Sequence, residues 1–371
     1  MTATGPQAAR FDRLRSIMLD HGIDLLALAP TDSLRYALGF SPFPDERLST
    51  LLLSSNASAF VVPSINAEDV RKSTGDIPMF VWDDATGPLD AVGAAISSLG
   101  LDGPISLAVD PEMRADALLV IQSILPHAQF LDGALVLQPA REVKSGHEIE
   151  FLRASAATAD VAMHQALDAC RLGVTELAIA QAAVEGFRSA GVAQVSFAIV
   201  GSGPNGAFPH HHTSDRLLVE GDAVVIDLGG RLNDYSSDVT RMAYVGEPSA
   251  RYREVHDVVD SAVVAASKAV TPGATCGQVD AAARDVIVAA GYGEYFVHRT
   301  GHGLGLSMHE PPWIIGGSAT IIQEGMVFSI EPGIYLPGEF GVRLEEIVHV
   351  TSSGCAAFSS LSREVRSVRA A

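Results

Sequence analysis

VVIDLGGRLNDYSSDV, residues 224–239, is the segment from which the organisation of this chain is best understood. An apolar run ending in Asp227, a glycine pair, a polar stretch and a second run carrying Asp238 predict a β-hairpin with a loop of several residues. With the turn centred between residues 232 and 233, the two aspartates lie opposite each other and point to the same face. A buried aspartate needs a compensating cation. Two turn aspartates that only fix a loop explain the hairpin equally well, so other segments have to decide.

The composition indicates an ordered globular protein with room for an internal cleft. Hydrophobic residues make up 47% of the 371 residues and charged residues 19%. At roughly 150 residues per domain, this length predicts about two domains. The formal net charge of −19 argues against nucleic acid or an anionic membrane as a partner, because phosphate binding needs clustered Lys and Arg.

The cysteines and the hydropathy pattern favour the cytoplasm. Cys170, Cys276 and Cys355 are odd in number, far apart and in none of the zinc or redox spacings. Residues 1–15 are polar and rich in turn formers, so no signal peptide is expected. No apolar run approaches the ~18 residues of a membrane span.

The first part of the chain alternates helical and strand-like segments. A helix is expected over 6–21, strands over 23–28, 51–53, 59–63, 79–82 and 105–109, and helices over 89–99 and 113–125. This pattern predicts a compact α/β domain over 1–139. It contains no metal-binding or nucleophile pattern, so dimer contact and fencing of a cleft are its expected roles. The polar segment 139–146, with Pro and Gly, separates it from a second domain over 140–371.

The second domain begins with two predicted helices, 147–170 and 175–189, and a strand at 195–200. A glycine-rich loop over 201–209 then leads to His210, His211 and His212. No helix follows it directly and no Lys-Ser/Thr pair is present, so a phosphate-binding loop is not expected. Helices over 251–269 and 278–290 follow the central hairpin. The two halves of the domain share no clear repeat of residue identity.

Two further segments carry residues suited to metal chemistry. HRTGHGLGLSMHE, residues 298–310, places His298, His302 and His309 among glycines that can bend the backbone and direct the imidazoles. MVFSIEPGIYLPGEFGVRLEEIVHV, residues 326–350, predicts a second hairpin, in which Glu331 and Glu345 face each other about position 338. The chain therefore offers two hairpins with a facing pair of acids each.

Convergence of these segments would require cations. Four ionised carboxylates ~4 Å apart repel each other by ~4 kcal/mol per pair at an effective dielectric constant of about 20, against a total stability of ~5 to 15 kcal/mol. One imidazole and four carboxylates can hold two divalent ions in the arrangement that many hydrolases use. Oxygen-rich ligation favours manganese, cobalt, iron or zinc, and affinity order alone does not choose among them.

Four of the C-terminal motifs together resemble one enzyme family. IDLGG with YSSDVTR, TGHGLGLSMHE, SIEPGIY and GVRLEE are similar to the motifs of the metallopeptidases that include prolidase, aminopeptidase P, methionine aminopeptidase and creatinase. The resemblance is looser before about residue 140, where SLRY and GF at 33–40 match a segment common in the prolidase and creatinase branch. It implies a mixed α/β (α+β) fold, with a small creatinase-like α/β domain followed by a pita-bread catalytic domain. The pita-bread domain has a pseudo-twofold antiparallel sheet flanked by helices.

The resemblance also implies a ligand set for two divalent ions, with manganese as the first expectation and cobalt, zinc or iron as alternatives. Asp227 would chelate one ion, and Asp238 and Glu345 would bridge both. The ligand set of the second ion would be completed by His302 and Glu331. A water molecule would be the nucleophile, because the ions lower its pKa.

Catalytic and substrate-binding roles follow from the same resemblance. Glu331 would relay a proton to the departing amine, His309 would polarise the scissile carbonyl, and His210 would lie beside the leaving nitrogen. Supporting or substrate-contacting positions are His298 and Arg343, and Trp313 would be an apolar wall for a proline ring or part of the core. His211 and His212 are expected to be structural.

The implied reaction is hydrolysis of the peptide bond before proline, in Xaa-Pro dipeptides or at the N terminus of longer peptides. All five ligand positions are filled, which argues against a creatinase reaction, since creatinase lacks the metal set. Some prolidase relatives have an arginine just after the His-Glu-x-Pro run, where Trp313 stands here, and this difference favours an aminopeptidase over a dipeptidase. A hydrolase or lyase of small non-peptide compounds and a non-catalytic scaffold are the alternatives. Short proline-containing peptides and a second copy in a homodimer are the implied partners.

Overall fold

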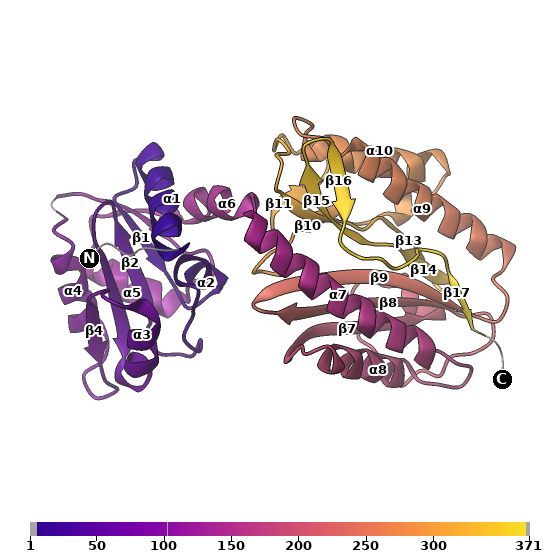
Figure 1. Ribbon diagram of the computed structural model, residues 1–371, viewed down its shortest axis with the longest axis horizontal. Helices are drawn as coiled ribbons and strands as arrows, with labels where there is room; N and C mark the ends of the chain where they lie inside the picture. Colours follow the sequence, from indigo (N-terminus) through magenta and orange to yellow (C-terminus); the bar gives the residue numbers. More distant parts are fainter. Residues whose placement is uncertain (1–5, 102, 369–371) are drawn as a thin grey trace. The chain divides into compact units, whose positions relative to one another are not determined.

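The computed structural model describes residues 6–101 and 103–368, and the chain divides into two compact units, Met1–Arg141 and Glu142–Ala371 (Figure 1). Residues 1–5, the start of the segment in which no signal peptide was expected, lie outside the described residues. Position 139, the predicted end of the first domain, falls inside helix α6 (Ala134–Glu142), which continues past Pro139.

The first unit is the expected α/β domain. Its elements are α1 (Pro6–Asp20), β1 (Leu25–Leu28), α2 (Asp32–Leu38), β2 (Thr50–Ser54), β3 (Ser58–Pro63), η1 (Ser64–Asn66), α3 (Ala67–Thr74), β4 (Met79–Trp82), α4 (Leu89–Ser98), β5 (Ser106–Val109), α5 (Ala115–Ile124), β6 (Gln129–Asp132) and α6. The strands form one mixed sheet in the order β4-β3-β2-β1-β5-β6. Because β1 and β2 are buried along their whole length, their sequences LLAL and TLLLS are almost entirely apolar. Five elements of this unit were not predicted: α2, η1, α3, β6 and α6.

Local capping explains one of these omissions. The side chain of Thr31 accepts a hydrogen bond from the Ser33 amide and starts α2, and Gly39 ends it with a φ of 71°. The helix has seven residues, which is too short for hydrophobic periodicity to reveal it.

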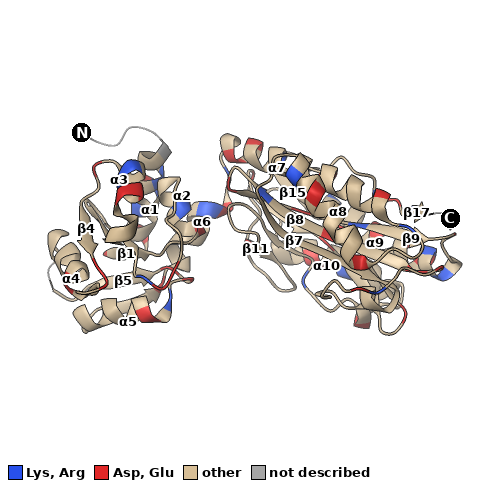
Figure 2. Cartoon of the chain, turned by 90° about the horizontal axis from the view of Figure 1, so that it is seen from below, with Lys and Arg blue, Asp and Glu red and all other residues tan. Residues whose placement is uncertain are grey.

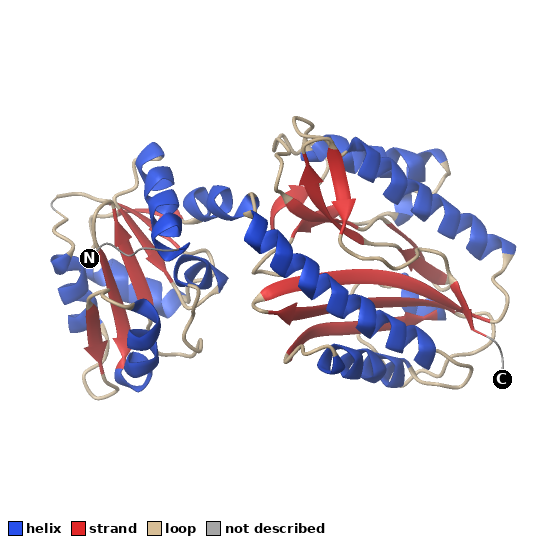
Figure 3. Cartoon of the chain, viewed as in Figure 1, coloured by secondary structure: helices blue, strands red, loops and turns tan. Residues whose placement is uncertain are grey.

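The second unit consists of two helix pairs and three sheets (Figure 3). Its elements are α7 (Gly146–Ala169), α8 (Glu176–Ser189), β7 (Gln194–Ser202), η2 (Gly203–Ala207), β8 (Ala223–Leu232), β9 (Tyr235–Val245), α9 (Ala250–Ala269), α10 (Cys276–Ala289), η3 (Gly293–Tyr295), β10 (Gly301–Gly303), β11 (Glu310–Ile314), β12 (Val327–Ile330), β13 (Gly333–Leu336), β14 (Phe340–Arg343), β15 (Glu346–Thr351), β16 (Gly354–Ala357) and β17 (Arg366–Val368). The sheets have the orders β17-β9-β8-β7, β11-β10-β12-β15-β16 and β13-β14. The predicted mixed α/β fold is confirmed.

The two helix pairs repeat each other in backbone geometry. α8 and α10 have 14 residues each and begin after capping threonines, Thr175 and Thr275, whose side chains accept from the amide three residues on. The loops before them turn at Gly173 and Gly273, with φ of 77° and 92°. One pair packs on the β7–β9 sheet and the other on the β12–β15 side. Comparison of residue identities missed this repeat because capping and small-residue packing allow many different sequences.

The register of the β8–β9 hairpin corrects one prediction. Asn233 and Asp234 form a two-residue turn with φ of 50° and 68°, the backbone of a type I′ turn. The turn centre is thus one residue later than expected, and Asp227 pairs with Thr240 while Asp238 pairs with Gly229. The two aspartates are diagonal neighbours, not direct partners. They still point to the same face, because the offset is two residues.

The second hairpin has the predicted register. Gly333 pairs with Arg343 in β13–β14, and Ile330 pairs with Glu346 in β12–β15, so both ladders are symmetric about position 338. Glu331 and Glu345 lie in the interruption between the two ladders. Freed from regular pairing, both acids are available to a shared site.

Candidate metal centre

The structure brings the five predicted metal-ligand positions together. Three overlapping groups have candidate ligand atoms within 4.8 Å of one another: Asp227, Asp238 and Glu345; His302, Glu331 and Glu345; and Asp238, His302 and His309. The residues come from β8, β9, β10, the segment just before β11 and the interruption of the second hairpin. Segments separated by more than 100 residues therefore meet at one point, as predicted. His309, predicted to act on the substrate, also lies within reach of this cluster.

The burial of these acids is unfavourable without a cation. Asp238 is 7% exposed and Glu345 is 1% exposed. One oxygen on each of three carboxylates, Asp227 Oδ1, Asp238 Oδ1 and Glu345 Oε1, is buried without a hydrogen-bond partner in the described structure. Burial and the repulsion of neighbouring carboxylates raise the pKa of Asp238 and of Glu345 well above its usual value. Divalent cations satisfy these atoms and remove the repulsion, so the residues fit a metal site.

The imidazole of His302 has the orientation of a ligand. Its Nδ1 lies 3.0 Å from the Gly303 carbonyl oxygen, and a carbonyl can only accept, so Nδ1 carries the proton. Nε2 lies 3.3 Å from Glu331 Oε1 and 3.9 Å from Asp238 Oδ2. A ring nitrogen that faces two carboxylates requires a proton or a metal ion between them.

Arg343 orients two acids, Asp227 directly and Glu345 through Thr240. Its Nη2 donates to Asp227 Oδ2 at 2.6 Å, and its Nε donates to Thr240 Oγ1 at 3.2 Å. Thr240 in turn donates to Glu345 Oε2 at 2.9 Å. The remaining oxygens of Asp227 and Glu345 are the unpartnered ones. The guanidinium therefore orients both carboxylates toward the centre, which agrees with the supporting role among the two that were predicted for Arg343.

His298 is fully engaged by protein groups. Nδ1 lies 2.7 Å from the Arg299 carbonyl oxygen, and Nε2 lies 2.8 Å from the Tyr335 hydroxyl. Arg343 Nη1 donates to the same hydroxyl at 2.9 Å, so the Tyr335 proton points to His298. Burial lowers the pKa of His298 and raises that of Tyr335 to about 12. His298 thus orders Tyr335, a residue that the sequence analysis did not single out, and has no free nitrogen for a substrate.

The cluster forms the floor of a cavity of 900 Å³. Its walls are largely apolar and include Phe197, Ile199, Phe208, Val297 and Ile315. The Phe197 ring packs directly over Gly229 on the neighbouring strand, where a Cβ atom would collide with it. The cavity also includes His210, His298 and His309, whereas Trp313 is not among its lining residues. The Trp313 ring instead stacks with the guanidinium of Arg299, with 4.3 Å between Cζ and the ring centroid.

His309 is placed to donate a hydrogen bond into the cavity. Its ring centroid is 4.1 Å from that of His302. Burial, and then the nearby charges of His302 and Arg299, lower the pKa of His309 to about 4. At neutral pH the ring is therefore uncharged and keeps one N–H donor. The next residue, Glu310, forms a buried ion pair with Lys144 at 2.7 Å, which anchors the His309 loop.

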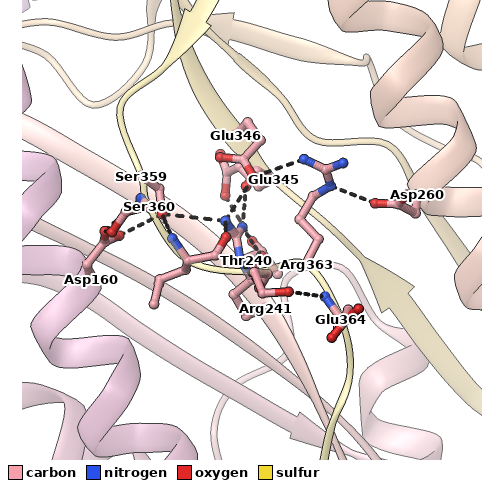
Figure 4. A network of polar contacts seen from close by, with 12 residues as sticks. Asp160, Thr240, Arg241, Asp260, Glu345, Glu346, Ser359, Ser360, Arg363 and Glu364 are labelled. Atoms are coloured by element: carbon pink, nitrogen blue, oxygen red, sulfur yellow. Dashed lines mark hydrogen bonds and ion pairs between the residues drawn. The ribbon is translucent and has the colours of Figure 1, made fainter.

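A network of hydrogen bonds around Arg241 holds the backbone of Glu345 in place (Figure 4). Arg241 is 2% exposed; its Nη1 donates to the Glu345 carbonyl oxygen at 2.5 Å and its Nη2 donates to Glu346 Oε1 at 2.9 Å. The network continues through Arg363 to Asp260. It ties β9 and β15 to the C-terminal segment. No sequence signal identified Arg241 beyond its place in the YSSDVTR motif.

A buried carboxylate, that of Glu176, holds the loop that carries His210 in place. Glu176 is completely buried, and its carboxylate accepts six hydrogen bonds, from Ser202 N and Oγ, Asn205 Nδ2, His211 Nε2 and Ser214 N and Oγ. His211 was predicted to be structural, and its contact agrees with that role. Glu176 was missed, because an acid in the first turn of a helix usually serves the helix dipole alone.

In Figure 2, Lys and Arg are dispersed among Asp and Glu rather than gathered on one element. Within residues 6–101 and 103–368, no helix has the length and apolar character that a membrane span needs. Cys170, Cys276 and Cys355 are all free thiols.

Buried carboxylates with free oxygens and an imidazole, at the floor of an apolar cavity, define a site for metal-dependent hydrolysis. Comparison with known proteins specifies the class. Residues 150–352 match the model of metallopeptidase family M24, and residues 10–143 match that of the creatinase/prolidase N-terminal domain. The chain belongs to metallopeptidase family M24.

Several individual proteins are similar along almost the whole chain. A probable dipeptidase, PepE, from Mycobacterium tuberculosis is 39% identical over 93% of this chain and 92% of its own length. The Xaa-Pro dipeptidase of Lactobacillus helveticus is 34% identical over 96% and 98%, respectively. The crystal structure of a prolidase from Thermococcus sibiricus superposes with a TM-score of 0.93 at 32% identity, covering 99% of this chain and all of that one. The predicted family, fold and class of enzyme are confirmed.

Proposed function

We propose that this metallopeptidase uses two divalent ions to hydrolyse the peptide bond that precedes proline in short peptides. The observation that carries the proposal is the set of three buried, unpartnered carboxylate oxygens on Asp227, Asp238 and Glu345, since atoms of this kind require cations. Relatives named Xaa-Pro dipeptidase and prolidase support the substrate class.

The ligands of the ions would be Asp227, Asp238, His302, Glu331 and Glu345. When bound, the ions lower the pKa of the attacking water and polarise the scissile carbonyl. The cavity walls exclude bulk water and hold the substrate side chains, which strengthens electrostatic interactions at the floor.

Three side chains would act on the substrate and the attacking water. Burial raises the pKa of Glu331, but the hydrogen bond and charge of His302 lower it more, to about 2. Its ionised carboxylate can accept a proton from the water and pass it to the departing proline nitrogen. The uncharged ring of His309 would donate its N–H to the oxygen of the scissile carbonyl. His210, which also lines the cavity, would lie beside the leaving nitrogen.

Manganese is the proposed metal. Four carboxylates and one imidazole form an oxygen-rich ligand set, and no thiolate is among them. Elemental analysis of protein purified without added metal, followed by reconstitution with manganese, cobalt, zinc or iron, identifies the ion that restores turnover. A protein with no stoichiometric divalent ion and no binding on reconstitution would be the non-catalytic scaffold.

A cytoplasmic location and a homodimer are also proposed. Three free thiols suit a reducing compartment. The N-terminal domain is proposed to take part in the dimer contact and to border the partner's cleft. Analytical ultracentrifugation of the full chain tests the oligomeric state directly.

The decisive experiment compares peptides with the metal-loaded protein. Ala-Pro, Ala-Pro-Ala and Ala-Ala are assayed with manganese, and metal-free protein is the control. Cleavage of the first or second peptide but not of Ala-Ala is expected. If the metal is bound and none of the proline peptides is hydrolysed, the proposed activity is wrong and the small non-peptide substrates become the leading alternative.

A further inference from the structure

Two arginines line the cavity, and they differ in their hydrogen-bond partners. Arg343 is 4% exposed and is committed to Asp227, Tyr335 and Thr240. The Arg299 guanidinium makes no hydrogen bond or ion pair with any residue of the described chain. Its one specific contact is the stacking on Trp313. An arginine in this state keeps all five N–H donors for a ligand.

The position of Arg299 is fixed relative to the metal centre. Trp313 pairs with His302 across β10 and β11, so the ring that supports the guanidinium belongs to the same ladder as a ligand position. Stacking on an indole orients the guanidinium plane and limits its rotamers. Arg299 is also close enough for its charge to act on Glu331 and His309. The cation and the reacting groups therefore line the same cavity, and Trp313 supports the cation.

The balance of charges in the cavity indicates that Arg299 would bind an anionic group of the substrate. The ligand set carries four carboxylates, which two divalent ions neutralise, so the loaded centre exerts little net attraction on an anion. The remaining walls are largely apolar. An anionic substrate group next to the scissile bond would therefore find its complement at Arg299, through a bidentate pair.

We propose, building on the proposed function, that Arg299 binds the free α-carboxylate of a dipeptide, with Trp313 as its support. In a dipeptide this carboxylate is one residue from the scissile bond. In a longer peptide a neutral amide takes its place and leaves Arg299 without a partner. The site therefore selects dipeptides. The aromatic residue at 313, which by sequence favoured an aminopeptidase, supports a cation supplied by the loop before β10.

The test removes the carboxylate and the guanidinium separately. Manganese-loaded wild type, Arg299→Ala and Arg299→Lys are assayed on Ala-Pro, its amide Ala-Pro-NH2 and Ala-Pro-Ala. Wild type should prefer the dipeptide by about 10- to 100-fold in kcat/KM, the range for hydrogen bonds to a charged group. Arg299→Ala should lose that preference, mainly through KM for Ala-Pro, with the amide unaffected. The lysine variant should restore part of it, because it keeps the charge but loses the bidentate geometry.

A matched variant and a binding measurement complete the design. Arg188→Ala removes an exposed arginine whose partner is Glu185, and its kinetics should equal those of wild type. Calorimetry with L-proline and L-prolinamide measures the carboxylate contact without turnover: proline should bind more tightly to wild type, and Arg299→Ala should bind both equally.

Three results would overturn the inference. They are equal loss of activity on dipeptide and amide in Arg299→Ala, equal turnover of the two by wild type, and unchanged proline binding in the variant. In each of these three outcomes the wild type still cleaves Xaa-Pro bonds, so the proposed function stands. Absence of any Xaa-Pro cleavage by the metal-loaded wild type would refute the proposed function instead, and calorimetry would still decide whether Arg299 binds a carboxylate.

Discussion

Replacement of Glu176 by glutamine should destabilise the second unit by about 3 kcal/mol at neutral pH. Burial raises the pKa of this carboxyl, but hydrogen bonds from Ser202, His211, Ser214 and Asn205 lower it more, from 4.5 to about 2. A difference of about 2.5 pKa units corresponds to about 3 kcal/mol between the ionised and neutral forms in the folded state. Glutamine has the shape of the neutral acid and can accept on one oxygen only, so it should lose this amount.

The pH dependence of the effect has a definite sign. Because the folded-state pKa of Glu176 is below its ordinary value of 4.5, its stabilisation is complete above about pH 5 and is lost as the pH falls from 4.5 toward 2. The difference in unfolding free energy between wild type and Glu176→Gln should be constant from pH 8 to about 5.5. It should shrink below pH 4.5.

Urea unfolding followed by tryptophan fluorescence measures this difference. The chain has two tryptophans, Trp82 in the first unit and Trp313 in the second, so a Trp82→Phe background makes the signal report on the second unit. Glu185→Gln is the matched control, because Glu185 is on the same helix, is 56% exposed and pairs with exposed Arg188. It should change stability by less than about 0.5 kcal/mol. A Glu176→Gln effect equal to that of the control, or one that does not depend on pH between 7 and 4, would refute the reasoning.

Three further predictions concern the centre itself. Glu331→Gln should slow peptide hydrolysis by about 10² to 10⁴-fold, the range for general acid–base catalysis, with an unchanged circular dichroism spectrum; normal turnover would remove Glu331 from the proton path. His309→Ala should slow it by about 10² to 10³-fold with unchanged metal content in elemental analysis, whereas loss of metal would make His309 a ligand. Asp238→Asn should raise the melting temperature of chelator-treated protein while lowering its metal content, because burial and then the repulsion of neighbouring carboxylates raise the pKa of this acid. A less stable metal-free variant would contradict this reasoning.

Local patterns in the sequence carried much of the fold. The strands 79–82 and 59–63 and the long helices of the second unit were evident from runs of apolar residues and their spacing, and β4 and α8 have nearly the predicted bounds. Elements such as α2 were not evident, because seven residues between capping groups leave no periodicity to detect.

The turn of the central hairpin shows where such local reasoning fails. The Asn233–Asp234 pair adopts left-handed backbone angles, which places the turn centre one residue later than expected. The pairing therefore shifts by two residues, and Asp227 and Asp238 become diagonal neighbours. The type of turn depends on how both strands pair with the rest of the sheet. Residue composition alone allowed more than one centre.

The sequence by itself determined which kinds of atoms this protein would bring to a site: acids at the ends of apolar strands, an imidazole among glycines, and motifs that resemble one family. Only the tertiary structure decided which carboxylate oxygens are free, that His298 has no free nitrogen, that Trp313 carries the Arg299 guanidinium, and that Glu176 anchors the His210 loop. The reason is physical. Strand and helix patterns arise from neighbours a few residues apart, whereas hydrogen-bond partners and burial arise from packing between segments far apart in the chain.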